Sequence, residues 1–327
     1  MAHEGVYLLL NPYGEIEMKK LTKFLIYVNS IKDSDRTFTN RIADIIREKG
    51  GTVSVASGDQ DTKGGSVRPN LIEDKEAVIV LGGDGTMLRA AHTTSKYKLP
   101  LTGINLGTVG FLAETDFSRA EELIDRLMSG DYKMLEKMVL KGSISRMDSK
   151  ITEADQNSDD KERSESADNT SSDIEENSYT AINDIVIYRD GKLRIIMLNI
   201  FVNGQFFETY KADGVIISTP TGSTAYNLSA GGPLVSPMAR NIILTPIAPH
   251  SLTGKSFVFA DTDRISIEVV EKSKNEGSSA LVSYDGYKDV SMTESCKCDI
   301  SVMDETVKFI SVSDRNFYDV LRSKLGS

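Results

Sequence analysis

The stretch AVIVLGGDGTMLRAA, residues 77–91, changes character in its middle. Its first five residues are all apolar, which is typical of a buried strand, and its last five favour a helix. The glycine-rich turn between them surrounds a single carboxylate, that of Asp84. A strand, such a turn and a helix together gather free backbone N–H groups at the positive helix end, where phosphate groups bind. The predicted phosphate-binding loop consists of Gly82, Gly83, Gly85 and Thr86.

Asp84 is the residue of this turn that needs an explanation, because a carboxylate beside a phosphate is repelled. It is tolerated when it has a task, such as holding Mg²⁺ or taking a proton from an attacking hydroxyl. The alternative is a turn in which Asp84 only caps the helix. Known phosphate-loop motifs do not decide between these, since no lysine motif of the Walker type is present and Leu88 replaces the last glycine of a G-x-G-x-x-G frame.

Around this turn the first half of the chain alternates apolar runs with helical patterns. Ser34 is expected to cap one helix, Ser118 with Glu121 forms a capping box for another, and a third begins after Thr86. This alternation predicts an α/β, Rossmann-like domain with a mostly parallel sheet covered on both faces. The expected strands are 23–29, 52–56, 77–81 and 101–105.

After about residue 138 the rhythm becomes that of strands joined by short turns. Asp190-Gly191 and Asn203-Gly204 each lie between β-rich runs and predict hairpins. We therefore expect an all-β, layered, sandwich-like second domain. A helical pattern returns at 314–325 and is expected to pack back on the first domain. The predicted domains are 1–138 plus about 305–327, and 139–304; whether residues 1–17 are an appendage stays open.

The net charge of −10 belongs mainly to one segment. Residues 148–178 carry 11 acidic and 3 basic residues and no aromatic residue, so we predict a disordered surface insertion there. The rest is nearly balanced and has no basic stripe, which argues against nucleic-acid binding. No membrane helix or signal peptide is expected, which favours the cytoplasm. Cys296, Cys298 and three histidines are too few for a zinc site.

The run from residue 212 to 237 is dense in Ser, Thr and Gly and carries no charge after Asp213. Hydroxyl and backbone donors without fixed charge suit the recognition of ribose, amide and phosphate groups. A flexible serine-rich linker is the alternative, but interleaved apolar residues such as Ile216 and Leu228 argue against it.

Taken together, these motifs resemble those of the NAD kinase family. The resemblance extends from about residue 23 to the C-terminus, apart from the acidic insertion. GGDGT alone is shared with lipid kinases and phosphofructokinases, whereas the run from Asp213 to Pro233 is more specific. The matching segments, in order, are 82–86, 103–114, 180–187, 211–233, 246–252 and 283–286.

The resemblance implies a phosphoryl transfer from ATP, or sometimes polyphosphate, to the 2′-hydroxyl of the adenosine ribose of NAD. Mg²⁺ accompanies the ATP, and no protein ligand for it is assigned. Asp84 matches the general base of the family, and Arg89, on the first turn of the following helix, is expected to neutralise phosphate charge. Family members are commonly homodimers or homotetramers. The implied NAD-binding residues are Asp84, Gly85, Arg89, Asn183, Asp184, Arg194, Lys211, Asp213, Thr224, Ala225, Tyr226, Asn227, Leu228, Ser229, Ala248 and Asp285.

Two positions depart from the family pattern. Tyr287 stands where many relatives have glutamine, and Asp184 stands where glutamate is common. Asp285 fits a hairpin turn as well as a ligand contact. Two rival functions remain open: a lipid kinase of the diacylglycerol type, and a non-catalytic NAD(P)-binding regulator. The regulator gives no reason for Asp84, and the lipid kinases usually have asparagine where this chain has Met87.

Overall fold

The chain folds into two compact units, Met1–Met138 with Glu305–Ser327, and Val139–Asp304. No helix within the ranges described below is long and apolar enough to cross a membrane. The predicted acidic insertion lies outside the described residues except for Ser178, which begins a strand. The computed structural model describes residues 8–10, 16–58, 61–63, 65–107, 110–113, 115–147, 178–191, 195–250, 254–270, 279–313 and 317–325.

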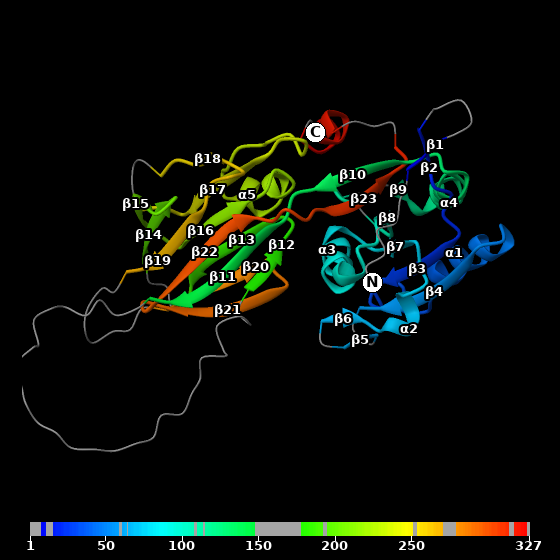
Figure 1. Ribbon diagram of the computed structural model, residues 1–327, viewed down its shortest axis with the longest axis horizontal. Helices are drawn as coiled ribbons and strands as arrows, with labels where there is room; N and C mark the ends of the chain where they lie inside the picture. Colours follow the sequence, from blue (N-terminus) through cyan, green and yellow to red (C-terminus); the bar gives the residue numbers. More distant parts are fainter. Residues whose placement is uncertain are drawn as a thin grey trace, which may run out of the picture. The chain divides into compact units, whose positions relative to one another are not determined.

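The first unit is built on a seven-stranded sheet (Figure 1). Its central strands are parallel, as the sequence predicted, and only β10 runs antiparallel to its neighbour β23. The strand order is β10 (Lys133–Lys137), β23 (Val307–Ser311), β8 (Leu101–Asn105), β7 (Ala77–Leu81), β3 (Lys23–Val28) and β4 (Thr52–Ser57), with β9 (Thr115–Asp116) beside β8. Two small hairpins are β1 (Leu8–Leu10) with β2 (Ile16–Met18), and β5 (Thr62–Lys63) with β6 (Ser66–Val67).

Helices cover this sheet because each has one apolar face. Ile42 and Ile46 of α1 and Leu127 of α4 belong to one buried cluster with Phe24 and Ile26 of β3. The helices of the unit are α1 (Thr37–Glu48), α2 (Pro69–Ile72), α3 (Asp84–Thr94), α4 (Ala120–Ser129) and α6 (Phe317–Leu325), with single 3₁₀ turns η1 (Ser95–Tyr97) and η2 (Phe117–Arg119).

The predicted helix caps are wrong at two starts. At α1 the Asp33 carboxylate, and not Ser34, accepts hydrogen bonds from the backbone N–H groups of Phe38 and Thr39. A carboxylate one residue further back reaches the first turn because Arg36 takes a left-handed conformation, with φ 59°.

Before α4 there is no capping box of Ser118 and Glu121. Asp116 accepts a hydrogen bond from the N–H of Ser118 instead, which places a 3₁₀ turn ahead of the helix. The stop at Gly130 is confirmed, with φ 86° in the left-handed C-cap position.

The second unit is a sandwich of two six-stranded antiparallel sheets, which confirms the all-β layered prediction (Figure 1). Alternate residues of the strands, such as Ile185 and Ile187 of β13 and Leu198 and Ile200 of β14, form one buried cluster. One sheet runs β12 (Ser178–Ala181), β11 (Leu140–Arg146), β22 (Cys296–Val302), β19 (Ile265–Val269), β14 (Ile196–Val202) and β15 (Gln205–Ala212). The other runs β18 (Phe257–Ala260), β17 (Asn241–Ile247), β16 (Gly214–Ser218), β13 (Asp184–Arg189), β20 (Ser279–Tyr284) and β21 (Lys288–Thr293).

Of the two predicted hairpins, one is confirmed and one is wrong. Asn203 and Gly204 join β14 to β15 with φ values of 52° and 78°, as a tight hairpin turn requires. Asp190-Gly191 instead follows β13, which pairs with β16 and β20, while β14 belongs to the other sheet. The local turn signal is the same at both places. The difference lies in the strand pairing, because β14 pairs with β15 and β19 and not with β13.

Candidate active site

The GGDGT turn lies at the carboxyl end of β7, where the strand order of the first unit changes direction. β3 has β4 on one side and β7 on the other, and α3 begins directly at Asp84. In open α/β sheets, ligands bind at the carboxyl ends of strands at such a switch point. Because α3 begins at Asp84, Arg89 lies on the second turn of this helix, and the prediction that placed it on the first turn is wrong.

Asp84 is fixed in place by backbone donors from a loop after β8. Its Oδ2 accepts a hydrogen bond from the N–H of Phe111 at 2.8 Å, and its Oδ1 accepts one from Leu112 at 3.0 Å. A Cβ on Gly110 would overlap this carboxylate. Asp84 is half-buried, and each carboxylate oxygen keeps a further lone pair. The side chain does not cap its own helix, so the simple capping alternative is wrong.

Asn29 and Lys32 follow β3 in the chain and lie close to the same turn. The sequence analysis did not predict either residue. Asn29 donates a hydrogen bond through Nδ2 to the hydroxyl of Thr86 at 3.4 Å. A Cβ built on Gly83 would lie 3.6 Å from Nζ of Lys32, so this ammonium group lies beside the turn. Parallel neighbours β3 and β7 end at the same sheet edge, which was the one signal that could have found them. Lys32 is thus a cation placed to contact phosphate.

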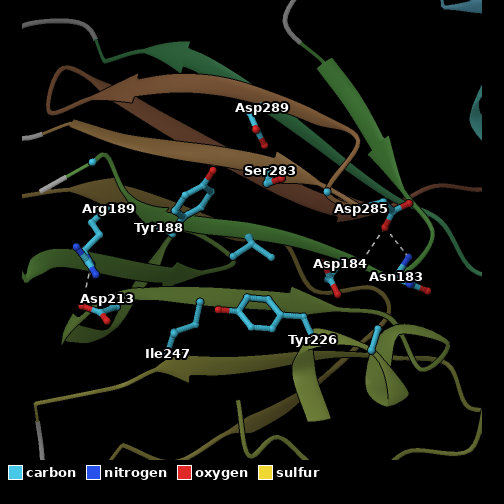
Figure 2. Close-up of a pocket in the computed structure, with 14 residues that line it drawn as sticks. Asn183, Asp184, Tyr188, Arg189, Asp213, Tyr226, Ile247, Ser283, Asp285 and Asp289 are labelled. Carbon is cyan, nitrogen blue, oxygen red and sulfur yellow. Dashed lines mark hydrogen bonds and ion pairs between the residues drawn. The ribbon is translucent and has the colours of Figure 1, made fainter. Parts of the chain in front are cut away.

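The second unit contains a pocket of about 780 Å³ on the outer face of the sheet that contains β13, β16 and β20 (Figure 2). Because side chains alternate along β13, Ile185 and Ile187 enter the sandwich core while Asp184, Val186 and Tyr188 face the pocket. The lining residues are Asn183, Asp184, Val186, Tyr188, Arg189, Gly191, Asp213, Ala225, Tyr226, Ile247, Ser283, Asp285, Gly286 and Asp289. Six of the predicted NAD-binding residues are among them.

Asp285, in the turn after β20, binds the backbone that precedes β13. Its carboxylate accepts hydrogen bonds from the N–H groups of Ile182 at 2.8 Å, Asn183 at 2.8 Å and Asp184 at 3.0 Å. Its own N–H donates to the carbonyl of Asp184 at 3.0 Å. The φ of Asp285 is 52°, so the residue makes the turn and contacts the site at once. The hairpin-turn interpretation is therefore confirmed, and the ligand contact of Asp285 stays a prediction.

Asp184 lines the same end of the pocket and is only 5% exposed. Burial, and to a lesser extent the negative charge of Asp285, raise the pKa of the Asp184 carboxyl group to about 7. Beside it, Oδ1 of Asn183 is buried without a hydrogen-bond partner. Most buried polar atoms in folded proteins have a hydrogen-bond partner, so Asn183 Oδ1 is an exception.

An ion pair marks the other end of the pocket (Figure 2). Arg189 Nε lies 3.1 Å from Oδ1 of Asp213, and the Arg189 N–H donates to the Asp213 carbonyl at 3.0 Å. Sequence reasoning found Asp213 but missed Arg189, which is the single cation among the described lining residues. Lys211 is exposed on β15 and does not line the pocket, and Arg194 lies outside the described residues.

The Ser-rich run after β16 forms η3 (Gly222–Thr224) and α5 (Tyr226–Ser229), which border the pocket. Ala225 and Tyr226 line it, as expected. Asn227 is fully buried: its Nδ2 donates to the carbonyl of Pro233 at 3.0 Å, and its Oδ1 accepts from the hydroxyl of Thr245 at 2.7 Å. Asn227 thus supports the loop from inside. Thr224, Leu228, Ser229 and Ala248 do not line the pocket.

The described residues contain no group of three or more His, Cys, Asp or Glu side chains placed to hold a metal ion. Cys296 and Cys298 are free thiols on β22, and Cys298 is buried in the sandwich core. The first unit thus contains a carboxylate held by backbone N–H groups with Lys32 beside the same turn. The second unit contains a polar pocket lined by carboxyl groups.

Comparison with known proteins agrees with these features. The ATP-NAD kinase N-terminal domain matches residues 13–132, and the ATP-NAD kinase C-terminal domain matches residues 182–312. An NAD kinase of Lachnospira eligens is 38% identical over 316 residues, covering 92% of this chain and 99% of the relative. One of Agathobacter rectalis is 36% identical over 306 residues, covering 93% and 98%.

Two solved structures share the fold. Yeast NADH kinase in complex with NADH has a TM-score of 0.74 at 23% identity, covering 99% of this chain and 92% of that one. An NAD kinase of Archaeoglobus fulgidus in complex with ATP has a TM-score of 0.65 at 24% identity, covering 92% and 99%. From the family matches and the curated relatives together, the chain belongs to the NAD kinase family of phosphotransferases.

Proposed function

We propose that the chain transfers a phosphoryl group from ATP to the 2′-hydroxyl of the adenosine ribose of NAD, with Asp84 as general base. The observation that carries this proposal is the carboxylate of Asp84, held by two backbone N–H groups at the start of α3. A secondary hydroxyl is a poor nucleophile at neutral pH. A positioned base that accepts its proton as the O–P bond forms accelerates the reaction by roughly 10²–10⁴-fold.

Charge neutralisation supplies the rest of the catalysis in phosphoryl transfer. Lys32 beside Gly83 and the N-terminal N–H groups of α3 are the groups of the first unit placed to contact phosphate oxygens. Bound Mg²⁺ would neutralise the phosphate charge, and the ATP itself would supply most of its oxygen ligands. Arg89, on the exposed side of α3, is a further candidate for phosphate contact.

The pocket of the second unit is the proposed NAD site. Asp184 offers a polar contact at one end, and Tyr226, which is 46% exposed, offers an aromatic ring to a base or ribose. A lipid kinase would need an apolar cleft, whereas four carboxylates line this pocket: Asp184, Asp213, Asp285 and Asp289.

The proposal is tested by one coupled assay. Purified protein receives Mg²⁺, NAD and either ATP or polyphosphate, and a dehydrogenase that accepts only NADP reads the product. NADP formation with ATP supports the proposal. No product from either donor, with NAD or NADH, contradicts it and leaves the lipid kinase and the regulator as the functions to test. The homodimer or homotetramer stays a prediction, to be measured by light scattering.

A further inference from the structure

The carboxyl groups of Asp184 and Asp285 lie at one end of the pocket, but they differ in the hydrogen bonds that they receive from the protein. The Asp285 carboxylate accepts hydrogen bonds from the three backbone N–H groups of residues 182–184. The Asp184 side chain receives none of these three hydrogen bonds. No described residue donates a hydrogen bond to the Asp184 side chain, although it is 95% buried and lines the pocket.

Among the described residues, no cation compensates the Asp184 carboxyl group either. Asp285 faces it from the turn between β20 and β21, whereas Asp289 on β21 belongs to the pocket lining without adding to the shift at Asp184. The neutral side chains nearby are those of Tyr226 on α5, Tyr188 further along β13, and Ser218, which is paired opposite Asp184 on β16. The one cation of the described lining, Arg189, is paired with Asp213 at the far end (Figure 2).

A buried carboxyl group without a donor or a cation is stable in its neutral form, in which it carries an O–H group. The shift of the Asp184 pKa to about 7 follows from the same burial and from Asp285. At neutral pH a large share of the molecules thus presents a hydrogen-bond donor at this position. An ionised aspartate would present acceptors alone.

We propose that Asp184 binds the nucleoside in its neutral form, donating a hydrogen bond to an acceptor atom of the ligand, and that Asp285 is the positioning residue that holds its backbone. The acceptor is a ring nitrogen or a ribose oxygen. This inference rests on the proposed function, because NAD is taken as the ligand. It predicts that a higher pH weakens binding, the reverse of what a carboxylate acting as acceptor would give.

The test is calorimetric titration of NAD into the full-length protein between pH 6 and pH 8.5. For a group with a pKa near 7 that binds only when protonated, the Kd of the wild type should rise about tenfold from pH 6 to pH 8. Asp184→Asn keeps a donor at nearly the same place. Its Kd should stay within about threefold of the wild-type value at pH 6 and should be independent of pH.

Asp289→Asn is the matched control, since it removes a pocket carboxylate from β21, which is separated from β13 by β20. It should retain the tenfold pH dependence. A wild-type Kd that is constant or falls from pH 6 to pH 8 overturns the role of Asp184, and this measurement needs no variant. If a folded Asp184→Asn protein binds NAD more than tenfold more weakly than the wild type at pH 6, the role of Asp184 is also overturned. A wild type that binds no NAD at any pH contradicts the proposed function and the inference with it.

The positioning role of Asp285 has its own readout. Asp285→Asn should speed hydrogen exchange of the amides of residues 182–184 and raise the Kd for NAD at every pH, whereas Asp289→Asn should leave that exchange as in the wild type. If Asp285→Asn retains both the exchange rates and the affinity, Asp285 is not a positioning residue.

Discussion

Gly110 lies against the carboxylate of Asp84 so closely that any side chain on Gly110 would overlap it. The next two N–H groups along the chain, those of Phe111 and Leu112, donate to the two carboxylate oxygens. The bare backbone of this loop is therefore what fixes the direction of the proposed base. Catalysis by a positioned group depends strongly on such geometry, since displacement by about 1 Å can cost roughly 100-fold in rate.

We expect Gly110→Ala to lower kcat by at least roughly tenfold, because the added methyl group displaces the Asp84 carboxylate. Gly107→Ala is the matched control in the same loop, where the nearest atom to the added Cβ is Oδ1 of Asn105 at 4.0 Å. Steady-state kinetics of both variants measure the difference. Equal activity of the two variants would contradict the arrangement.

Asp84→Asn should lower kcat by ~10²–10⁴-fold, because an amide accepts no proton from the attacking hydroxyl. The amide oxygen still accepts one backbone hydrogen bond, so the fold should persist. Thermal unfolding of the variant checks this, and the NADP-coupled assay measures the rate. A variant that keeps more than a tenth of the wild-type kcat would show that Asp84 is not the base.

Asp184 gives the unliganded protein a pH-dependent stability. Its pKa of about 7 in the folded state exceeds the ordinary value of 3.8, so the folded protein binds this proton more tightly than the unfolded chain. The resulting stabilisation is complete below about pH 4 and is lost as the pH rises through 7.

Asp184→Asn removes that dependence, because asparagine does not ionise. We expect the free energy of unfolding of the variant, relative to the wild type, to be higher at pH 8 than at pH 5 by on the order of 2 kcal/mol. Urea unfolding at the two pH values measures it, with Asp289→Asn as the comparison. A difference near zero would mean that Asp184 is already ionised in the folded protein at pH 5.

Asn227→Ala should destabilise the fold by about 2–4 kcal/mol, since it leaves the buried hydroxyl of Thr245 and the carbonyl of Pro233 without their partner. Ser229→Ala, on the exposed side of the same short helix, should change stability by less than about 0.5 kcal/mol. Chemical denaturation compares the two. If Asn227 instead contacted NAD directly, its replacement would raise the Kd while leaving the unfolding midpoint in place.

Local patterns were enough to predict the α/β character of the first unit and most of its strands. The five apolar residues of β7 and the face of α1 that carries Ile42 and Ile46 each specify burial through their own spacing. Caps were less predictable, because Asp33 and Asp116 bind N–H groups from positions that depend on the path of the preceding turn. The turn signal at Asp190-Gly191 failed because strand pairing is a property of the whole sandwich.

The sequence by itself determined the two fold classes, the loop around Asp84 and the family, since these depend on spacing along the chain and on motifs that stay contiguous. Only the tertiary structure decided which polar residues line the pocket and how the pKa of Asp184 is shifted. Residues far apart in sequence supply those surroundings: Asp285 holds the backbone of Asp184 from about a hundred positions away, and Arg189 pairs with Asp213 on another strand. The pKa and the direction of a side chain follow from burial and neighbouring charge, and both arise only when the sheets are assembled.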